Sequence, residues 1–239
     1  MTFRHLEEII VKEGREADYL SIADGLKEPT RSTYSYLLDI ASVLRQNSLQ
    51  DQYQVFGGYA VLAHLIKQYG DRIVLAWRGS QDIDMIGNMQ VLTALKGFYQ
   101  VKSDLPSPNI PSKRTIKLST DNEEECKIDY TTGQKRGRTE VVPILGIEVP
   151  VLEPSELIKS KLYAKDELVH KVDIVKMLGI LEVRKYDPEE FAQSLTPEQR
   201  LDIYDVVLTG HDMTRNARMT MGPSKEYMSK LRDSLRRLK

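Results

Sequence analysis

The first part of the chain combines one long helical pattern with a short strand and a glycine turn. Tyrosine, leucine and alanine recur at helical spacing over residues 32–47, which predicts an amphipathic helix. A β-prone run at 53–56 ends in Gly57 and Gly58, and a second helical pattern follows at once and stops at Gly70. The pattern therefore predicts helix, strand, tight turn and helix in that order.

The next segments mix strand and helix signals. The β-prone run at 72–77 predicts a second strand, and alternation of polar and apolar residues over 79–85 predicts another. Residues 89–98 carry a helical pattern. Residues 103–113 contain three prolines and are expected to form a loop.

Further strands are predicted before the chain changes character. Residues 115–119 and 126–130 alternate polar and apolar positions, as half-buried strands do. Residues 141–151 are expected to form one or two more strands, interrupted at Pro143 and Gly146. The predicted strands therefore all lie in the first two thirds of the sequence.

From Pro154 onward the pattern is helical. Helices are predicted at 155–164, 167–178, 188–194, 197–208 and 223–238. Thr196 to Gln199 fits a capping box with proline at the first helical position, and Gly210 is expected to end that helix. We therefore expect an α+β domain over 1–150, with an N-terminal helical extension, and a helical domain over 151–239.

Composition narrows the class of protein. The chain has 239 residues, of which 41% are hydrophobic and 29% charged, as in soluble globular proteins rather than disordered ones. No run approaches the roughly 18–20 apolar residues of a membrane span, and the N-terminus lacks the pattern of a secretory signal. The single cysteine, Cys126, excludes an internal disulfide framework and a cysteine-rich zinc cluster. We expect a cytoplasmic protein with no membrane partner.

Charge is nearly balanced overall but unevenly distributed. The formal net charge is −1, which argues against a protein built wholly to wrap nucleic acid. Residues 211–239 nevertheless carry eight Lys and Arg against three Asp and Glu, and a second basic group comprises Lys135, Arg136 and Arg138. These groups are either solvated surface or contacts for the phosphates of an RNA.

The strand pattern at 79–85 contains two aspartates with metal-binding chemistry. Asp82 and Asp84 are two residues apart, so their side chains leave the same face of a strand, about 6–7 Å apart. Two carboxylates held this close repel each other unless a cation lies between them. Mg²⁺ suits them, because it binds carboxylate oxygens together with water and substrate phosphates. Surface strands also produce this spacing by chance.

The neighbourhood of the two aspartates strengthens the metal interpretation. Gly57 and Gly58 lie between a strand and a helix, where backbone amides can approach a phosphate, although a plain tight turn needs the same residues. Asp129 lies on the strand predicted at 126–130. If that strand pairs with the one bearing Asp82 and Asp84, three carboxylates converge, as two-metal phosphoryl transfer requires.

Four sequence blocks in a fixed order carry a family resemblance. Residues 56–60 (FGGYA) and 78–84 (RGSQDID) together resemble the signature of the nucleotidyltransferase superfamily, which has the polymerase-beta-like fold. They look most like its AbiEii branch, the toxins of abortive-infection and toxin–antitoxin systems. Residues 152–162 are similar to that branch's lysine-bearing helix, and residues 171–175 to its downstream aspartate-bearing helix.

The resemblance implies a fold and a set of roles. The fold is a nucleotidyltransferase-like mixed α+β sheet with flanking helices, followed by an α-helical C-terminal domain. The implied ligands of two Mg²⁺ (or Mn²⁺) ions are Asp82, Asp84 and Asp129, with Asp129 also the base. The implied nucleotide-binding residues are Gly57, Gly58, Arg78, Ser80 and Lys161. Asp173 completes the catalytic set, with Lys161.

Two positions are open to a second interpretation. Tyr59 stands where many superfamily members carry a serine that contacts the triphosphate. Lys161 projects from the apolar stripe of its predicted helix, and Asp173 lies in a segment that is apolar nearly all round. Lys161 and Asp173 either form a salt bridge with each other or line the nucleotide cleft, as the resemblance implies.

The resemblance also implies an activity. It indicates a nucleotidyltransferase that moves a nucleoside monophosphate from an NTP to an acceptor, RNA such as the tRNA 3′ end. In the AbiEii branch such an enzyme is a toxin with a cognate antitoxin. The alternatives are a non-catalytic nucleotide-binding or regulatory protein on the same fold, and a nucleotidyltransferase of the antibiotic-modifying type that acts on small molecules.

Overall fold

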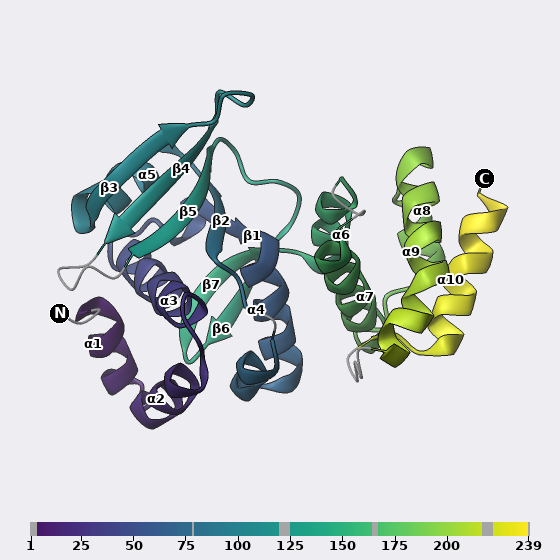
Figure 1. The fold of residues 1–239 in the computed structure, drawn as a ribbon, viewed down its shortest axis with the longest axis horizontal. Helices are drawn as coiled ribbons and strands as arrows, with labels where there is room; N and C mark the ends of the chain where they lie inside the picture. The colour runs from purple at the N-terminus through teal and green to yellow at the C-terminus, as the bar shows by residue number, and fades with distance from the viewer. Residues whose placement is uncertain (1–3, 78, 120–124, 164–166, 217–221, 239) are drawn as a thin grey trace. The chain divides into compact units, whose positions relative to one another are not determined.

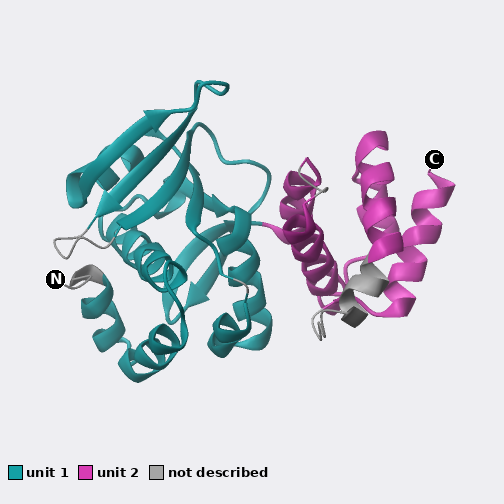
Figure 2. Cartoon of the chain, viewed as in Figure 1, with its two compact units in different colours: residues 1–152 teal, residues 153–239 magenta. Residues whose placement is uncertain are grey.

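The chain forms two compact units, residues Met1–Leu152 and Glu153–Lys239 (Figure 2). The computed structural model describes residues 4–77, 79–119, 125–163, 167–216 and 222–238. Arg78, one of the predicted nucleotide-binding residues, lies outside the described residues. Within the described ranges, no helix is long and apolar enough to cross a membrane.

Unit 1 is built on one mixed sheet (Figure 1). Its seven strands lie in the order β3-β4-β5-β2-β1-β7-β6. Their bounds are β1 Tyr53–Phe56, β2 Asp82–Gly87, β3 Gln100–Pro106, β4 Lys113–Ser119, β5 Glu125–Thr132, β6 Thr139–Ile144 and β7 Ile147–Leu152. The pairs β2–β5 and β1–β7 are parallel, and the other pairs are antiparallel. The predicted α+β class with a mixed sheet is confirmed.

Helices cover the apolar side of this sheet. Unit 1 contains α1 Arg4–Lys12, α2 Glu16–Gly25, α3 Thr30–Gln46, α4 Gly57–Tyr69 and α5 Met89–Phe98, with short 3-10 helices η1 Gln50–Gln52 and η2 Asp71–Ala76. Helix α3 contacts β5 and β7, and α4 contacts β1, β2 and β6. Ile83 on β2 and Ile128 on β5 are fully buried, whereas alternate positions on these strands are half-exposed. One face of the central strands is therefore core, and the other is polar.

The strand predicted at 72–77 is wrong. The segment forms η2 Asp71–Ala76, directly after Gly70, which ends α4 with φ 85°. Only Val74 of η2 is buried, and Leu75 is 48% exposed. Because the segment has no sheet partner, its β-prone residues follow the local turn rather than their propensity.

The interruptions that were predicted from Pro106, Pro143 and Gly210 are also wrong. Residues 103–106, expected to be part of a loop, belong to β3, an edge strand where Pro106 is the last residue. Pro143 lies inside β6, the opposite edge strand, so it does not interrupt the strand. An edge strand tolerates proline, because one of its sides needs no N–H donor. Gly210 does not end its helix, which continues for six further residues to Asn216.

Unit 2 is helical. Its helices are α6 Pro154–Leu162, α7 Leu168–Val183, α8 Pro188–Gln193, α9 Pro197–Asn216 and α10 Lys225–Arg237. The predicted capping box at the start of α9 is confirmed: the Gln199 amide donates to Thr196 Oγ1 at 3.2 Å, and the Thr196 amide donates to Gln199 Oε1 at 3.0 Å. Helix α7 contacts α6 and α9, and α10 contacts α8 and α9.

Candidate active site

The polar face of β2 and β5 carries the three predicted carboxylates, and we call it the carboxylate face. Asp82 and Asp84 lie on the same side of β2, both half-buried, while Ile83 between them points into the core. The parallel pairing of β2 with β5 places Asp84 opposite Asp129. This is the strand pairing on which the predicted convergence of carboxylates depends.

The Gly57–Gly58 turn lies against one of these carboxylates. Phe56 pairs with Asp84 across β1 and β2, and Gly57 follows with φ 66°. A Cβ at Gly57 would lie 1.9 Å from Asp84 Oδ2. Glycine is therefore required at position 57 for two reasons. The backbone there is left-handed, and a Cβ would clash with the Asp84 carboxylate. Gly58 is buried in the first turn of α4.

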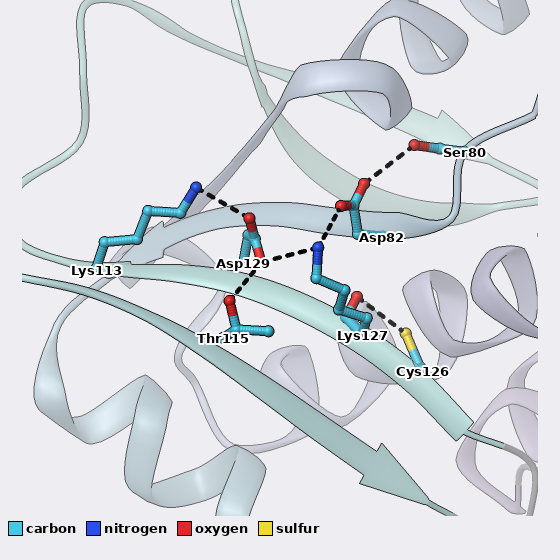
Figure 3. Close-up of polar contacts among 7 residues, drawn as sticks. All are labelled: Ser80, Asp82, Lys113, Thr115, Cys126, Lys127 and Asp129. Atoms are coloured by element: carbon cyan, nitrogen blue, oxygen red, sulfur yellow. Dashed lines mark hydrogen bonds and ion pairs between the residues drawn. The ribbon is translucent and has the colours of Figure 1, made fainter. Parts of the chain in front are cut away.

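Two lysines and a threonine hold the carboxylates (Figure 3). Lys127 Nζ lies 2.9 Å from Asp82 Oδ2 and 3.4 Å from Asp129 Oδ1. Lys113 Nζ lies 2.9 Å from Asp129 Oδ2, and Thr115 Oγ1 donates to Asp129 Oδ1 at 3.0 Å. Asp129 thus receives contacts on both of its carboxylate oxygens.

These contacts determine the charges of Asp129 and Lys127. Burial opposes ionisation of Asp129, but hydrogen bonds from Lys113 and Thr115 and the charges of the two lysines outweigh it and lower its pKa. Burial also opposes the charge of Lys127, but the hydrogen bond to Asp82 and its charge, together with Asp129, raise the pKa of Lys127. At neutral pH Asp129 is therefore an anion and Lys127 a cation.

The carboxylate face carries oxygen ligands of the kind that bind divalent cations, and in this structure the Lys127 ammonium lies among these oxygens. Within the part of the chain that the structure describes, no group of three or more His, Cys, Asp or Glu side chains is gathered to hold a metal ion. The Lys127 ammonium lies between Asp82 and Asp129. Carboxylate oxygens are the ligands that Mg²⁺ prefers. Asp82 and Asp129 therefore offer the type of donor that Mg²⁺ binds, and in this structure these donors contact the Lys127 ammonium.

Ser80 and Tyr59 lie differently relative to this face. Ser80 Oγ donates to Asp82 Oδ1 at 3.5 Å, so the predicted triphosphate contact is at least adjacent to the carboxylates (Figure 3). Tyr59 is 1% exposed, and its ring centroid lies 5.1 Å from that of Trp77. Because Tyr59 is core, the position at which many superfamily members carry a serine offers no hydroxyl to a ligand here.

The loop between β5 and β6 brings a basic residue to the glycine turn. The Arg136 guanidinium carbon lies 5.3 Å from the centroid of the Phe56 ring, and the Arg136 amide donates to Gln54 Oε1 at 3.1 Å. Phe56 shares the side of the sheet with Asp84, its pairing partner. One charge of the predicted basic group therefore lies over Phe56, the residue that precedes Gly57.

Sequence reasoning missed the lysines of this face. Lys127 lies two residues before Asp129 on a predicted strand, so the same alternation that placed Asp129 also placed Lys127. Lys113 and Thr115 needed the β4–β5 register, in which Thr115 is opposite Asp129.

Lys161 and Asp173 form an ion pair inside unit 2. Lys161 Nζ lies 2.9 Å from Asp173 Oδ2, and the side chains are 5% and 0% exposed. The salt bridge that the sequence left open is therefore present, joining α6 and α7. A role for either residue at the nucleotide stays a prediction.

Comparisons with known proteins find similar solved structures at low sequence identity. No protein-family model matches the chain, and no curated protein matches it. A candidate nucleotidyltransferase from H. pylori shares 15% identity at TM-score 0.45, over 89% of this chain and 96% of its own. An antigenic nucleotidyltransferase-like protein from Paracoccidioides brasiliensis shares 17% identity at TM-score 0.41, over 59% of this chain and 75% of its own.

A third solved structure is more distant still. The polyadenylate synthase of Megavirus shares 10% identity at TM-score 0.34, over 63% of this chain and 31% of its own. At these identities and TM-scores, function has to be argued from the residues of the carboxylate face.

Proposed function

We propose that the chain is a metal-dependent nucleotidyltransferase that transfers a nucleoside monophosphate from an NTP to a hydroxyl acceptor. The observation that carries the proposal is the register of the sheet, in which Asp84 lies opposite Asp129. It is supported by Gly57, whose missing Cβ leaves room for the Asp84 carboxylate at the start of α4.

The residues of unit 1 divide the proposed work between them. Asp82, Asp84 and Asp129 would hold two Mg²⁺ or Mn²⁺ ions, which supply charge neutralisation of the triphosphate and activation of the attacking hydroxyl. The backbone amides of Gly57 and Gly58 would bind phosphate oxygens at the N-terminus of α4. Ser80 and Arg78 would add contacts to the same triphosphate.

Asp129 is the proposed proton acceptor. The acceptor oxygen forms a bond to the α-phosphorus as the bond to pyrophosphate breaks, and the hydroxyl proton passes to Asp129. Asp129 is deprotonated at neutral pH, and its lowered pKa makes it a weaker base than a free aspartate. Thr115, which donates to Asp129 Oδ1 at 3.0 Å, fixes the orientation of that carboxylate.

For Lys161 and Asp173 the proposal rests on the resemblance. It gives Lys161 the neutralisation of phosphate oxygens, with Asp173 beside it. The buried ion pair of 2.9 Å between them is the contact that the alternative, a purely structural role, requires. The two roles separate by experiment, because only one of them involves the nucleotide.

RNA, such as the tRNA 3′ end, is the proposed acceptor, and the AbiEii resemblance adds a toxin with a cognate antitoxin. The basic group at Lys135, Arg136 and Arg138 supports an anionic acceptor, because Arg136 lies against Phe56 beside the glycine turn. The toxin and antitoxin rest on the resemblance alone.

The test is incubation of the protein with α-labelled NTPs, Mg²⁺ and total RNA. We expect label in RNA with the wild-type chain and none with the Asp82→Ala, Asp84→Ala double variant. Asp104→Ala is the matched control, since Asp104 on β3 pairs with Lys96 and Arg114. Label incorporated equally by the double variant would contradict the proposal. In a parallel incubation with a small-metabolite extract added, label found only on the small molecules would move the acceptor away from RNA.

A non-catalytic nucleotide-binding protein is the second candidate. Two observations favour it: Lys127 now bridges Asp82 and Asp129, and Tyr59 supplies no hydroxyl near the glycine turn. Calorimetry separates the two candidates. Nucleotide binding that is unchanged by EDTA and gives no product would select the binding protein.

A further inference from the structure

Lys127 contacts the carboxylate oxygens that the proposed function assigns to metal. Its ammonium lies 2.9 Å from Asp82 Oδ2 and 3.4 Å from Asp129 Oδ1, and so it joins β2 to β5. In the β2–β5 register Lys127 is the residue directly opposite Asp82. The strand pairing therefore places the Lys127 ammonium on the carboxylate face.

An ammonium and a divalent cation compete for these oxygens. Both are attracted by the same carboxylates, and they repel each other at such distances. Metal binding through Asp82 Oδ2 and Asp129 Oδ1 is therefore opposed by Lys127 in its present position. The Lys127 side chain is 40% exposed, and its flexible four-carbon stem gives the ammonium other positions to occupy.

Asp129 keeps a partner when Lys127 leaves. Lys113 binds the other oxygen, Oδ2, at 2.9 Å from the neighbouring strand β4. Thr115 also donates to Asp129 from β4. The two lysines thus differ in which carboxylates they contact. Lys113 contacts Asp129, whereas the Lys127 ammonium contacts both Asp82 on β2 and Asp129 on β5.

We propose that Lys127 is a built-in counter-ion that couples metal binding to nucleotide binding. Without nucleotide, Lys127 competes with the metal for Asp82 and Asp129. When metal and NTP bind together, the displaced ammonium pairs with the triphosphate instead. Metal then strengthens nucleotide binding, and nucleotide strengthens metal binding by the same factor. This inference rests on the proposed function, because it uses the same carboxylates as metal ligands.

Lys117 provides the matched control. It lies directly opposite Lys127 across β4 and β5, so its side chain leaves the same face of the sheet. It is 52% exposed and contacts Glu125 at 3.8 Å rather than a carboxylate of the proposed metal site. Lys117→Met removes one positive charge from the same face without opening the space between Asp82 and Asp129.

The experiment measures Mn²⁺ binding to the full chain by electron paramagnetic resonance. Wild type, Lys127→Met, Lys127→Arg, Lys117→Met and Asp82→Asn are compared with and without a non-hydrolysable NTP analogue. We expect Lys127→Met to bind Mn²⁺ about three- to fivefold more tightly than wild type without the analogue, the upper range for one partly exposed ion pair. Lys127→Arg and Lys117→Met should stay within about twofold of wild type, because Arg keeps the charge and Lys117 does not contact the site.

The analogue supplies the second readout. It should raise the Mn²⁺ affinity of wild type, and this gain should shrink in Lys127→Met. Affinity that is unchanged or weaker in Lys127→Met, with Asp82→Asn still abolishing binding, would overturn the role of Lys127 and leave the proposed metal site standing. Mn²⁺ binding that does not depend on Asp82 in any variant would overturn both.

Discussion

The molecule contains two lysine–aspartate pairs with the same geometry and different surroundings. Lys127–Asp82 in unit 1 and Lys161–Asp173 in unit 2 both have an N–O distance of 2.9 Å. The side chains of the first pair are 40% and 30% exposed, and those of the second 5% and 0%. Water screens the first pair, so its partners can be exchanged at small cost, whereas breaking the second leaves a buried charge. The two pairs thus have equal N–O distances, but the Lys127–Asp82 contact can be replaced at small cost and the Lys161–Asp173 contact cannot.

The largest predicted effect is on stability, from breaking the buried pair. Asp173→Asn leaves the Lys161 charge without its carboxylate and should lower the free energy of unfolding by about 3–5 kcal/mol. Lys127→Met should lower it by less than about 1 kcal/mol, because the pair it breaks is partly exposed. Urea denaturation of both variants measures the two values. Losses of similar size would contradict the distinction between the pairs.

The next prediction separates the two roles of Lys161. In a Lys161→Met, Asp173→Asn double variant no buried charge is left unpaired, so more of the fold survives than in Asp173→Asn. If Lys161 also neutralises phosphate, nucleotide transfer should still fall by about 10²–10³-fold at a temperature where the double variant is folded. A folded double variant that transfers at the wild-type rate would assign both residues to the scaffold of unit 2.

A smaller effect is expected at the glycine turn of unit 1. Gly57→Ala places a Cβ at 1.9 Å from Asp84 Oδ2 and a side chain at φ 66°, which together force Asp84 to move. The left-handed backbone alone costs about 1–2 kcal/mol, and transfer should fall as the carboxylate shifts. Gly97→Ala on α5 is the control, because its Cβ would meet nothing within 4 Å. Thermal melting and transfer assays compare Gly57→Ala with Gly97→Ala. Equal melting temperatures and equal transfer rates in the two variants would contradict this reasoning.

The smallest predicted effect concerns Arg136. Arg136→Ala removes the contact with Phe56, which should lower the free energy of unfolding by about 0.5–1 kcal/mol, and it should also weaken RNA binding. If Arg136 contacts a phosphate, the slope of log affinity against log salt should also fall by about one unit. Lys96→Ala in unit 1, where Lys96 pairs with Asp104 outside both basic groups, is the control. An unchanged salt slope in Arg136→Ala would remove this residue from the acceptor surface.

The sequence predicted those parts of the site that depend on local periodicity. Asp82, Asp84 and Asp129 could be placed on strand faces because alternation follows directly from the geometry of a strand. Gly57 could be identified because a glycine pair between strand and helix has a recognisable chemistry. The α+β class followed from the same patterns.

The remainder depended on pairing between distant segments. Strand register places Lys127 opposite Asp82 and Thr115 opposite Asp129. The register cannot be read from the local sequence pattern of either strand. The segment 72–77 has strand propensity but no strand beside it, so it became η2. Pro106 and Pro143 were misjudged because their positions on edge strands are a property of the whole sheet.

The most direct test of the central claim is the single-turnover transfer rate of Asp84→Asn. Asparagine keeps the size of the side chain beside Gly57 and removes only its charge. The account predicts a rate at least about 10³-fold below wild type, or about 4 kcal/mol of lost transition-state stabilisation, with an unchanged melting temperature. A folded Asp84→Asn variant that transfers nucleotide at the wild-type rate would show that the carboxylate face is not where the chemistry occurs.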